Sequence, residues 1–395
     1  DGIPAMFYRK FWNDVAGDLV ESMRESVRLG ELSTSQRQAI IILIEKKGKP
    51  KEEIKNLRPI SLLNVDYKIL TKVMSMRMAK VIDKLISPTQ TAYIKGRNVS
   101  NNLRFIDDIM KITKYENTPG LICGIDMAKA FDSISWKFME KCLEAFGFGT
   151  EFRKFVKTIY NRPESCILVN GTSTAYFTLE RGVRQGDCFS CLLFILCIEP
   201  LLRTIDEHEG IEGLMIDKLK NKSVAYADDC NFIIRNKNSL YALFSELRKY
   251  GAISGLKVNV DKTEVLLLGS NHRMNNEDTE DFVVEGHNLE VKNRIKICGI
   301  TFSYNEHEMK KFNFEDRLMA LKGQLNLWKQ RYLTLEGKIV ISKSLGLSQI
   351  IYPMQVMHIE DEFLKQVESA VYKFIWGRKD SARSPNDRIK RSMIQ

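Results

Sequence analysis

Acidic residues stand where three short apolar segments end or begin. Asp126 follows the apolar segment 120–125, and Asp228 and Asp229 lie between segments 224–227 and 231–234. Apolar runs of this length around two polar residues predict two strands joined by a tight hairpin. Carboxylates brought together repel one another, and burial would raise their pKa, so a cation must compensate them. Clusters of carboxylate oxygens suit Mg²⁺ or Mn²⁺.

The Asp-Asp pair by itself is a weak sign of a metal site, because turns are rich in Asp for local hydrogen-bonding reasons. A second carboxylate at a strand end strengthens it. If the two strands lie side by side, Asp126 comes next to Asp228 and Asp229. Paired divalent ions about 3.5–4 Å apart stabilise both the attacking and the leaving oxygen in phosphoryl transfer. The three residues therefore predict metal-assisted phosphoryl transfer.

The length and charge of the chain limit what surrounds this site. Its 395 residues can bury a large core and form more than one lobe. A hydrophobic content of 44% with 28% charged residues is typical of a soluble protein. The net charge of +10 favours a polyanionic partner, although charge alone does not distinguish that from a basic protein without one.

The eight cysteines do not indicate a zinc site or a disulfide framework. Cys188 and Cys191 form a single C-x-x-C pair without a second pair or a His doublet at zinc-ligand spacing. With no secretory signal visible, we expect a reduced, intracellular compartment. The longest apolar run, 188–198, is stopped by Glu199 and Pro200 and is shorter than the ~20 residues that span a membrane. No membrane partner is predicted.

Hydrophobic spacing predicts the elements that position the acidic residues. Asp132, a further acidic residue, suits a helix N-terminus and stays outside the predicted metal set. The predicted helices are 4–29, 65–86, 100–115, 189–202 and 239–250, followed by three helices between 314 and 376. The predicted strands include 39–44, 265–268 and 297–302, and a basic turn, 46–51, follows the first.

Four motifs occur in order along the chain: Arg58–Asn64 (RPISLLN), Ile125–Asp132 (IDMAKAFD), Arg181–Asp187 (RGVRQGD) and Tyr226–Asp229 (YADD). Together they closely resemble the reverse transcriptase domain of non-LTR (LINE-type) retrotransposons, and the resemblance covers essentially the whole chain. It implies an α+β fold with right-hand polymerase architecture. Mixed fingers with an N-terminal helical extension would occupy 1–119, an antiparallel-sheet palm 120–302, and a helical thumb with a basic tail 303–395.

The resemblance implies an RNA-directed DNA polymerase that extends a primer 3′-hydroxyl with dNTPs on an RNA template. Two Mg²⁺ ions, with Mn²⁺ as a substitute, would serve the reaction, and the partners would be an RNA template, a DNA primer and their hybrid. An RNA-directed RNA polymerase and a catalytically silent nucleic-acid-binding relic stay open as alternatives. Because the chain opens at Asp1 without an initiator Met, we expect a piece of a longer protein with endonuclease and further C-terminal domains. The resemblance also implies a nuclear location.

The resemblance assigns roles to individual residues. Asp126, Asp228, Asp229 and Met127 would contact the metal ions, and Lys262 would give a proton to the departing pyrophosphate, although it could equally be an exposed structural lysine. Phe131 would exclude a 2′-hydroxyl, the alternative being a core residue. The nucleotide would meet Arg58, Lys47, Phe131, Gln185 and Gly186. Primer and template would meet Lys95, Gly96, Arg97, Arg184, Cys298 and Gly299. Many family members carry prolines where this chain has Cys188 and Cys191.

Overall fold

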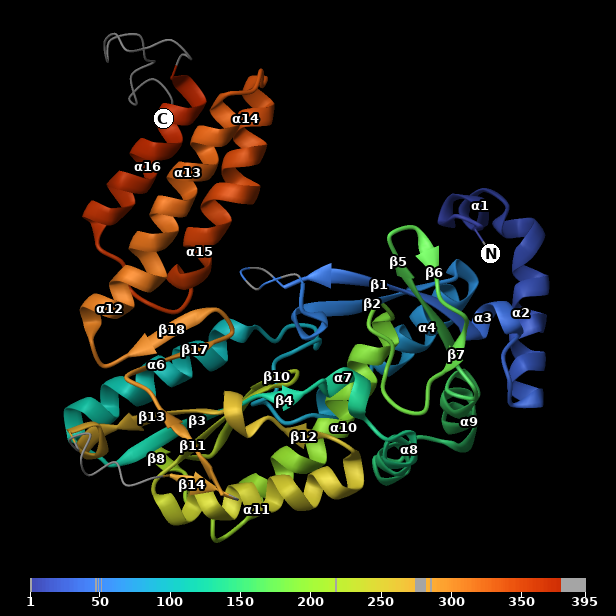
Figure 1. Ribbon diagram of the computed structural model, residues 1–395, viewed down its shortest axis with the longest axis horizontal. Helices are drawn as coiled ribbons and strands as arrows, with labels where there is room; N and C mark the ends of the chain where they lie inside the picture. Colours follow the sequence, from blue (N-terminus) through green and yellow to red (C-terminus); the bar gives the residue numbers. More distant parts are fainter. Residues whose placement is uncertain are drawn as a thin grey trace. The chain divides into compact units, whose positions relative to one another are not determined.

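The structure is a computed structural model that describes residues 2–46, 48, 50, 52–216, 219–273, 282–284 and 286–377. Helices and sheets are mixed, which confirms the predicted α+β class (Figure 1). The chain forms two compact units. Unit 1 comprises Asp1–Asn98, Leu121–Glu264 and Glu280–Glu290, and unit 2 comprises Val99–Gly120, Val265–Thr279 and Val291–Gln395. The three-lobe division stays a prediction, and Lys47 and the basic tail after Gly377 lie outside the described residues.

One sheet of unit 1 is centred on β1 (Gln38–Glu45). β2 (Leu57–Leu63) pairs with it antiparallel and β5 (Glu164–Val169) pairs with it parallel. The isoleucine-rich run of β1 favours a strand because β-branched side chains pack well on a pleated surface. Short strands β6 (Thr172–Ser173) and β7 (Phe177–Thr178) extend the sheet at β5.

A second sheet carries the acidic motifs. β10 (Ser223–Tyr226) and β11 (Asp229–Ile234) form the predicted hairpin, and β11 pairs antiparallel with β3 (Gly120–Ile125). Their apolar side chains are buried, except for that of Tyr226 at the end of β10, which is exposed. A small ribbon follows, in which β4 (Met127–Ala128) pairs with β12 (Lys257–Val258).

The core helix of unit 1 is α10 (Cys188–Glu207), which packs against α4 (Val65–Met78), α8 (Trp136–Ala145) and α11 (Lys237–Ser254). By length and composition alone it is apolar enough to cross a membrane, but 72% of its most apolar part is buried inside the protein, as expected of a core helix. The helix extends beyond the predicted range 189–202 at both ends, and Pro200 lies within it without ending it.

The other elements of unit 1 are mostly short. The predicted helix 4–29 is broken at Phe11, and the predicted helix 65–86 is broken after Met78. These elements are α1 (Ala5–Lys10), α2 (Trp12–Leu29), α3 (Thr34–Arg37), η1 (Ile54–Asn56), α5 (Ile82–Leu85), α7 (Ala130–Ser133), α9 (Thr150–Ile159), β8 (Leu214–Ile216), β9 (Leu219–Asn221), η2 (Val260–Lys262), β14 (Val283–Val284), β15 (His287–Asn288) and, at the boundary of the units, β13 (Glu264–Leu268) and β16 (Glu290–Val291).

Unit 2 is mainly helical. Its elements are α6 (Val99–Glu116), η3 (Gly269–Arg273), β17 (Arg294–Ile297), β18 (Ile300–Ser303), α12 (Glu306–Lys310), η4 (Lys311–Glu315), α13 (Asp316–Lys329), α14 (Leu335–Ile341), η5 (Ser342–Leu347), α15 (Ser348–Met354) and α16 (Asp361–Trp376).

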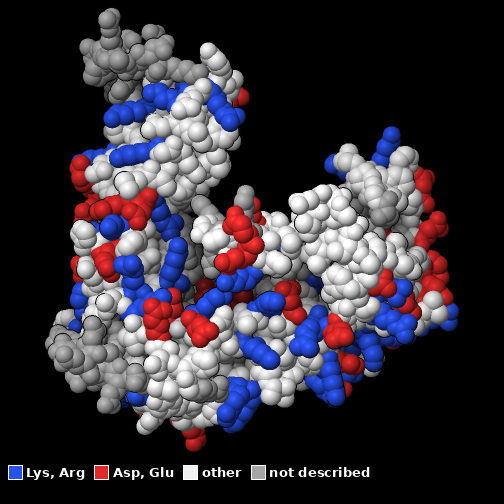
Figure 2. Space-filling model, viewed as in Figure 1, with Lys and Arg blue, Asp and Glu red and all other residues white. Residues whose placement is uncertain are grey.

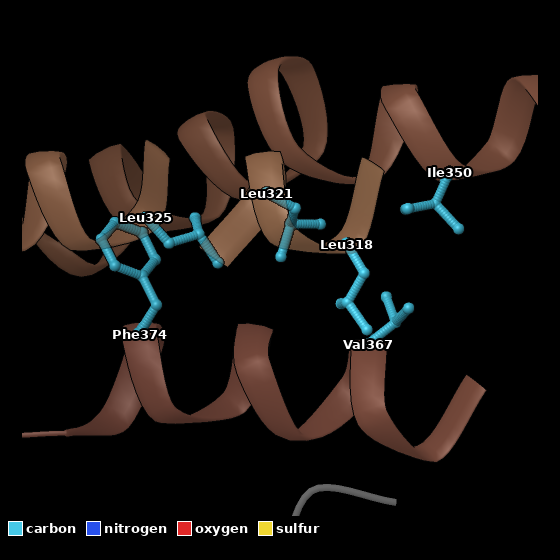
Figure 3. Close-up of a cluster of buried hydrophobic side chains, with 6 residues drawn as sticks. All are labelled: Leu318, Leu321, Leu325, Ile350, Val367 and Phe374. Atoms are coloured by element: carbon cyan, nitrogen blue, oxygen red, sulfur yellow. The ribbon is translucent and has the colours of Figure 1, made fainter. Parts of the chain in front are cut away.

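The core of the helical bundle is the apolar stripe of α13. Leu318, Leu321 and Leu325 recur at helical spacing and pack between α15 and α16 against Ile350, Val367 and Phe374 (Figure 3). These six side chains therefore form the core of the bundle.

Candidate active site

The catalytic candidates Asp228 and Asp229 lie at the tip of the β10–β11 hairpin. Tyr226 pairs with Asp229, so Ala227 and Asp228 form the turn between them. Ala227 has φ +56°, in the left-handed region. Two-residue hairpins need such a conformation to match the twist of their strands. The turn therefore presents Asp228 at the end of the sheet, with Asp229 at the first position of β11.

Asp126 reaches the same end of the sheet from β3. The register pairs Ile125 with Cys230, so Asp126 comes one residue beyond the end of β3, level with Asp229. Its backbone carbonyl accepts a hydrogen bond from the amide of Asn259 at 2.8 Å, which fixes the chain where it turns into β4. The predicted juxtaposition of Asp126 with the Asp228–Asp229 pair is thus present in the backbone.

The three carboxylates are close enough to interact electrostatically. Burial raises the pKa of the Asp228 carboxyl above its ordinary value, and repulsion from Asp229 and Asp126 raises it further. Asp126 in turn lies 3.5 Å from the ammonium group of Lys262. Asp229 accepts a hydrogen bond from the side-chain amide of Asn231 at 2.8 Å. The site therefore concentrates negative charge, and Lys262 is a cation that contacts it through Asp126.

Among the described residues, no group of three or more His, Cys, Asp or Glu side chains is already arranged as a metal cage. The donor chemistry nevertheless fits magnesium, because Mg²⁺ usually binds one or two carboxylates together with substrate phosphates and waters. The carboxylates of Asp126 and Asp229 repel that of the partly buried Asp228. A divalent cation bound between them would remove this repulsion. Met127 is buried, and only its backbone carbonyl suits such a hard cation.

The loop 181–187 is built closely onto neighbouring segments. Gly186 has φ +128°, and a Cβ placed on it would lie 2.4 Å from the carbonyl oxygen of Ser61 in β2. The amide of Ser61 donates to the carbonyl of Gln185 at 2.7 Å. The side-chain amide of Gln185 in turn donates to Asp132 at 3.1 Å. β2, the loop and α7 are therefore joined through Gln185 and Gly186.

Asp132 contacts the loop 181–187 directly, which the sequence did not indicate. It lies in the first turn of the short helix α7, as predicted. Burial raises the pKa of its carboxyl, while the hydrogen bond from Gln185 and the charge of Lys129 act in the opposite direction. Its contact with Gln185, a residue predicted to bind the nucleotide, was not foreseeable, because the two residues lie far apart in the chain.

Phe131 packs its ring on Phe194 of α10, with ring centroids 4.4 Å apart and an interplanar angle of 7°. The side chain is only partly buried. One face of the ring is thus used by the core, and the role of excluding a 2′-hydroxyl stays a prediction. Arg58 lies exposed on β2, opposite Ile44 of β1, and Lys95 is exposed beside Gly96, which has φ +88°.

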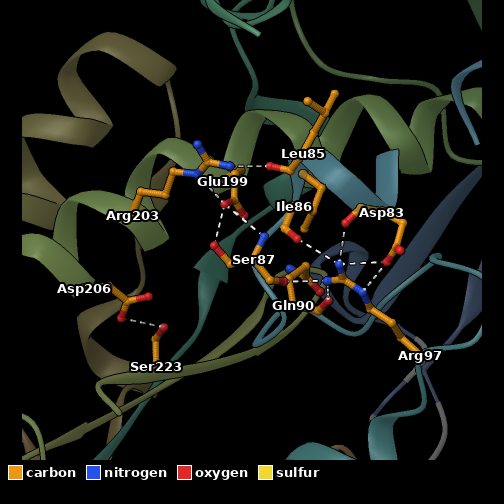
Figure 4. Close-up of polar contacts among 10 residues, drawn as sticks. All are labelled: Asp83, Leu85, Ile86, Ser87, Gln90, Arg97, Glu199, Arg203, Asp206 and Ser223. Carbon is orange, nitrogen blue, oxygen red and sulfur yellow. Dashed lines mark hydrogen bonds and ion pairs between the residues drawn. The ribbon is translucent and has the colours of Figure 1, made fainter. Parts of the chain in front are cut away.

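Arg97, expected to contact the template, uses its donors inside its own segment. Its guanidinium donates to the carbonyls of Asp83, Ile86, Ser87 and Gln90 and pairs with the Asp83 carboxylate (Figure 4). The side chain is only 14% exposed. Arg97 therefore organises the loop that follows α5 and does not present a free guanidinium to a phosphate.

Arg184 is likewise internal, because the residue is only 4% exposed. Its guanidinium donates to the carbonyls of Arg37 and Glu164 and lies 5.4 Å from the ring centre of Tyr67. A direct contact with primer or template would require this group to leave the core.

The primer-contact candidates Cys298 and Gly299 form the turn between β17 and β18, with φ +44° and +85°. Both carbonyls are occupied within unit 2. Tyr352 donates its hydroxyl to Cys298 at 2.6 Å, and Arg317 donates to Gly299 at 2.6 Å. The turn is thereby bound to the helical bundle.

The bundle also carries a basic groove between α13 and α16. The groove has a volume of about 570 Å³. Its lining includes four lysines, Lys322, Lys329, Lys365 and Lys373. Figure 2 shows Lys and Arg side chains distributed over the surface of this helical region. Lysines on such a surface supply point charges suited to phosphate groups.

The sequence pattern of one known family, "Reverse transcriptase (RNA-dependent DNA polymerase)", matches residues 44–310. A Xenopus laevis protein, "Transposon TX1 uncharacterized 149 kDa protein", is 29% identical over 382 residues, covering 95% of this chain and 28% of that protein. A Drosophila melanogaster protein, "Retrovirus-related Pol polyprotein from type-2 retrotransposable element R2DM", is 27% identical over 247 residues, covering 62% of this chain and 23% of that protein. The chain thus spans less than a third of the length of these curated relatives.

A solved structure of apo telomerase from Candida tropicalis covers 92% of this chain and 62% of its own, at 12% identity and a TM-score of 0.47. The resemblance drawn from the four motifs is confirmed by the match to the family pattern and by the retrotransposon relatives.

Proposed function

Since the chain belongs to the reverse transcriptase (RNA-dependent DNA polymerase) family, we propose that it extends a primer 3′-hydroxyl with deoxynucleotides on an RNA template. The observation that carries this proposal is the arrival of Asp126 from β3 at the end of the sheet where the β10–β11 turn presents Asp228. Two segments a hundred residues apart in the sequence thereby contribute interacting carboxylates to one site.

Two Mg²⁺ ions, held by Asp126, Asp228 and the Met127 carbonyl with help from Asp229, would activate the primer hydroxyl and neutralise charge on the triphosphate. The chain's own groups then complete the site. The Nζ atom of Lys262 lies 3.5 Å from the Asp126 carboxylate, where it would act as the proton donor to the departing pyrophosphate.

The nucleotide would lie between this carboxylate edge and the loop 181–187. Gln185 and Gly186 are fixed there by the contacts to β2 and Asp132. Arg58, exposed three residues before Ser61 on the same strand, supplies a guanidinium fork that suits triphosphate oxygens. Phe131, supported from behind by Phe194, would close the sugar pocket to a 2′-hydroxyl.

The template and primer would be held through their backbones. Lys95 is exposed in the segment after α5, and the lysines of the groove between α13 and α16 offer further positive charge. Contacts of this kind position a duplex without reading its sequence and weaken with rising salt. A parent protein with an endonuclease and C-terminal domains, and a nuclear location, stay predictions.

Primer extension on a homopolymeric RNA template, with and without Mg²⁺, tests this proposal. The wild-type chain should incorporate dNTPs only with the metal. Asp228→Asn should abolish extension while primer–template binding survives, because the loss is confined to the metal ligand.

Asp18→Asn is the matched control, since it removes the same charge from the exposed surface of α2. Retention of near wild-type extension by Asp228→Asn would contradict the metal role. Equal incorporation of ribonucleotides and deoxynucleotides would favour an RNA polymerase, and duplex binding without extension in any divalent metal would favour a silent relic.

A further inference from the structure

A buried glutamine contacts the catalytic turn from a distant part of the chain. Gln90, which is 0% exposed, accepts hydrogen bonds on its Oε1 atom from the amides of Ala227 at 2.9 Å and Ala92 at 3.1 Å. Its Nε2 atom donates to the carbonyl of Ala227 at 3.2 Å. Because two N–H groups face the oxygen and a carbonyl faces the nitrogen, the chemistry of the partners fixes the orientation of the amide.

The backbone beside Gln90 holds the strand that leads into the turn. The amide of Thr91 donates to the carbonyl of Ala225 at 3.0 Å, and the amide of Ala225 donates to the carbonyl of Thr89 at 3.0 Å. Gln90 is therefore the bridge partner of Ala225 in a short parallel pairing. The segment supports both the end of β10 and, through the Gln90 side chain, the tip of the hairpin.

Ala227, the residue to which Gln90 is hydrogen-bonded, has a strained backbone conformation. Ala227 is buried and has φ +56°, a conformation that is unfavourable for an L-residue and persists only where the surroundings enforce it. Gln90 pairs both polar backbone groups of Ala227. Without that amide, the left-handed turn would bury an unpaired N–H and leave its C=O with the weak thiol donor of Cys230 at 3.8 Å, and other turn conformations would compete with it. Each of these would aim Asp228 differently.

The other side of the supporting segment is anchored to the core helix α10. Glu199, which is 0% exposed, accepts from the backbone amide and the hydroxyl of Ser87 at 3.0 and 2.5 Å and pairs with Arg203 at 2.7 Å (Figure 4). Arg97 donates to the carbonyl of Gln90 itself at 2.7 Å. Gln90 is thus held in place before it reaches the turn.

We propose that Gln90 is a positioning residue for the polymerase reaction, which fixes the Ala227–Asp228 turn so that the Asp228 carboxylate stands beside Asp126. Gln90 contacts neither reacting atoms nor nucleotide; it acts through the turn. The proposal rests on the proposed function for its kinetic consequence, but the contact between Gln90 and Ala227 is testable without any activity.

The test is Gln90→Met, which keeps the length of the side chain and removes its hydrogen bonds. We expect kcat to fall and the half-saturating Mg²⁺ concentration to rise, each roughly 10–100-fold, as is usual when a residue that orients a metal ligand is lost. The KM for dNTP should stay unchanged, because the hydrogen bonds of the Gln90 side chain go to Ala227 and Ala92 and not to a residue expected to contact the nucleotide. Gln90→Asn, which keeps an amide that is one methylene too short, should give the same result and replaces Gln90→Met if that variant does not fold.

Tyr250→Phe is the control for a merely structural effect. It removes a buried hydrogen bond from α11 to the carbonyl of Cys197 in α10. It should lower the melting temperature as much as Gln90→Met does, yet keep kcat and the Mg²⁺ dependence of the wild type. An equal loss of kcat in both variants, or a folded Gln90→Met variant with kcat within threefold of wild type, would overturn the proposal.

Hydrogen–deuterium exchange of peptides covering residues 224–232 gives the readout that is independent of activity. Gln90→Met should accelerate exchange of the Ala227 amide at least tenfold without changing peptides of α10, and Tyr250→Phe should leave it protected. Unchanged exchange in Gln90→Met would refute the contact. The wild-type chain could fail to extend a primer while Gln90→Met still accelerates exchange of the Ala227 amide. That result would refute the proposed function and would confirm that Gln90 supports the turn.

Discussion

Gly186→Ala is the substitution whose effect can be worked out most directly from the structure. The added Cβ would lie 2.4 Å from the carbonyl oxygen of Ser61, whereas side-chain Cβ atoms essentially never approach other atoms within 3.0 Å. Either β2 or the loop 181–187 must therefore move by at least about 0.6 Å, because both partners are backbone and neither can rotate away. At φ +128° an alanine is also strained in its own backbone.

The displacement would move residues that are predicted to bind the nucleotide. Gln185 donates its side-chain amide to Asp132 and shares a backbone hydrogen bond with Ser61, so a shift of Gly186 carries Gln185 with it. A misplacement of about 1 Å in a site that positions reactants can reduce the rate about 100-fold. We expect Gly186→Ala to lower kcat/KM for dNTP by roughly this factor and to destabilise the protein by about 2 kcal/mol.

Gly147→Ala separates the two causes. Gly147 also has a left-handed φ, +76°, but nothing lies within 4 Å of its added Cβ. It should therefore cost about 1 kcal/mol in urea denaturation, as for a non-glycine residue in the left-handed region, and leave single-nucleotide incorporation unchanged. If Gly186→Ala retained kcat/KM within threefold of wild type, or if Gly147→Ala lost as much activity, the steric argument would be refuted.

Three further predictions concern the carboxylate edge and its surroundings. Lys262→Met should lower kcat by about 100-fold, the lower range for loss of a proton donor, while Lys257→Met on the neighbouring exposed strand β12 should not; equal rates for both in single-turnover extension would remove Lys262 from the reaction. Because burial raises the pKa of Asp228, its ionised form opposes folding above that pKa, so Asp228→Asn should raise the melting temperature of the metal-free protein at pH 7 by roughly 2–4 °C. That gain should shrink as pH falls through the raised pKa toward 3.8, and a gain independent of pH would show that ionisation of the buried Asp228 carboxyl is not its cause. Phe131→Val should increase ribonucleotide incorporation relative to deoxynucleotide about 100-fold, measured by competition on one RNA template; unchanged selectivity would leave the ring a core residue stacked on Phe194.

Sequence reasoning predicted the meeting of Asp126 with Asp228 and Asp229 because its signals are local. Apolar segments that stop at Asp126 and flank Asp228 predict strands, so these carboxylates fall at strand ends. The same holds for the leucine stripe of α13, whose spacing alone predicts a buried face. The predicted helix 4–29 was broken at Phe11 and the predicted helix 65–86 after Met78, because the apolar period alone does not show where a helix stops.

The roles of Arg97 and Arg184 could not be predicted from local sequence patterns. Arg97 and Arg184 have the residue type of a phosphate contact, but a guanidinium equally satisfies backbone carbonyls, and only the folded chain shows that those carbonyls surround them. Gln90 was missed for a related reason. Its partner Ala227 is 137 residues away, and an uncharged side chain within a loop motif gives no local sign that it will be buried against another turn.

The parallel pairing of β1 with β5 has a consequence for how the chain is made. Gln38 and Glu164, which meet at one end of this pairing, are 126 residues apart. At about 5–20 residues per second of translation, a ribosome needs on the order of 6–25 seconds to deliver β5 after β1 has emerged. During that interval β1 can form only its local hairpin with β2, and its other edge stays open to pairing with foreign strands. Slowing synthesis between these two strands should therefore increase aggregation of the nascent chain, and a chaperone that covers exposed strand edges should suppress it.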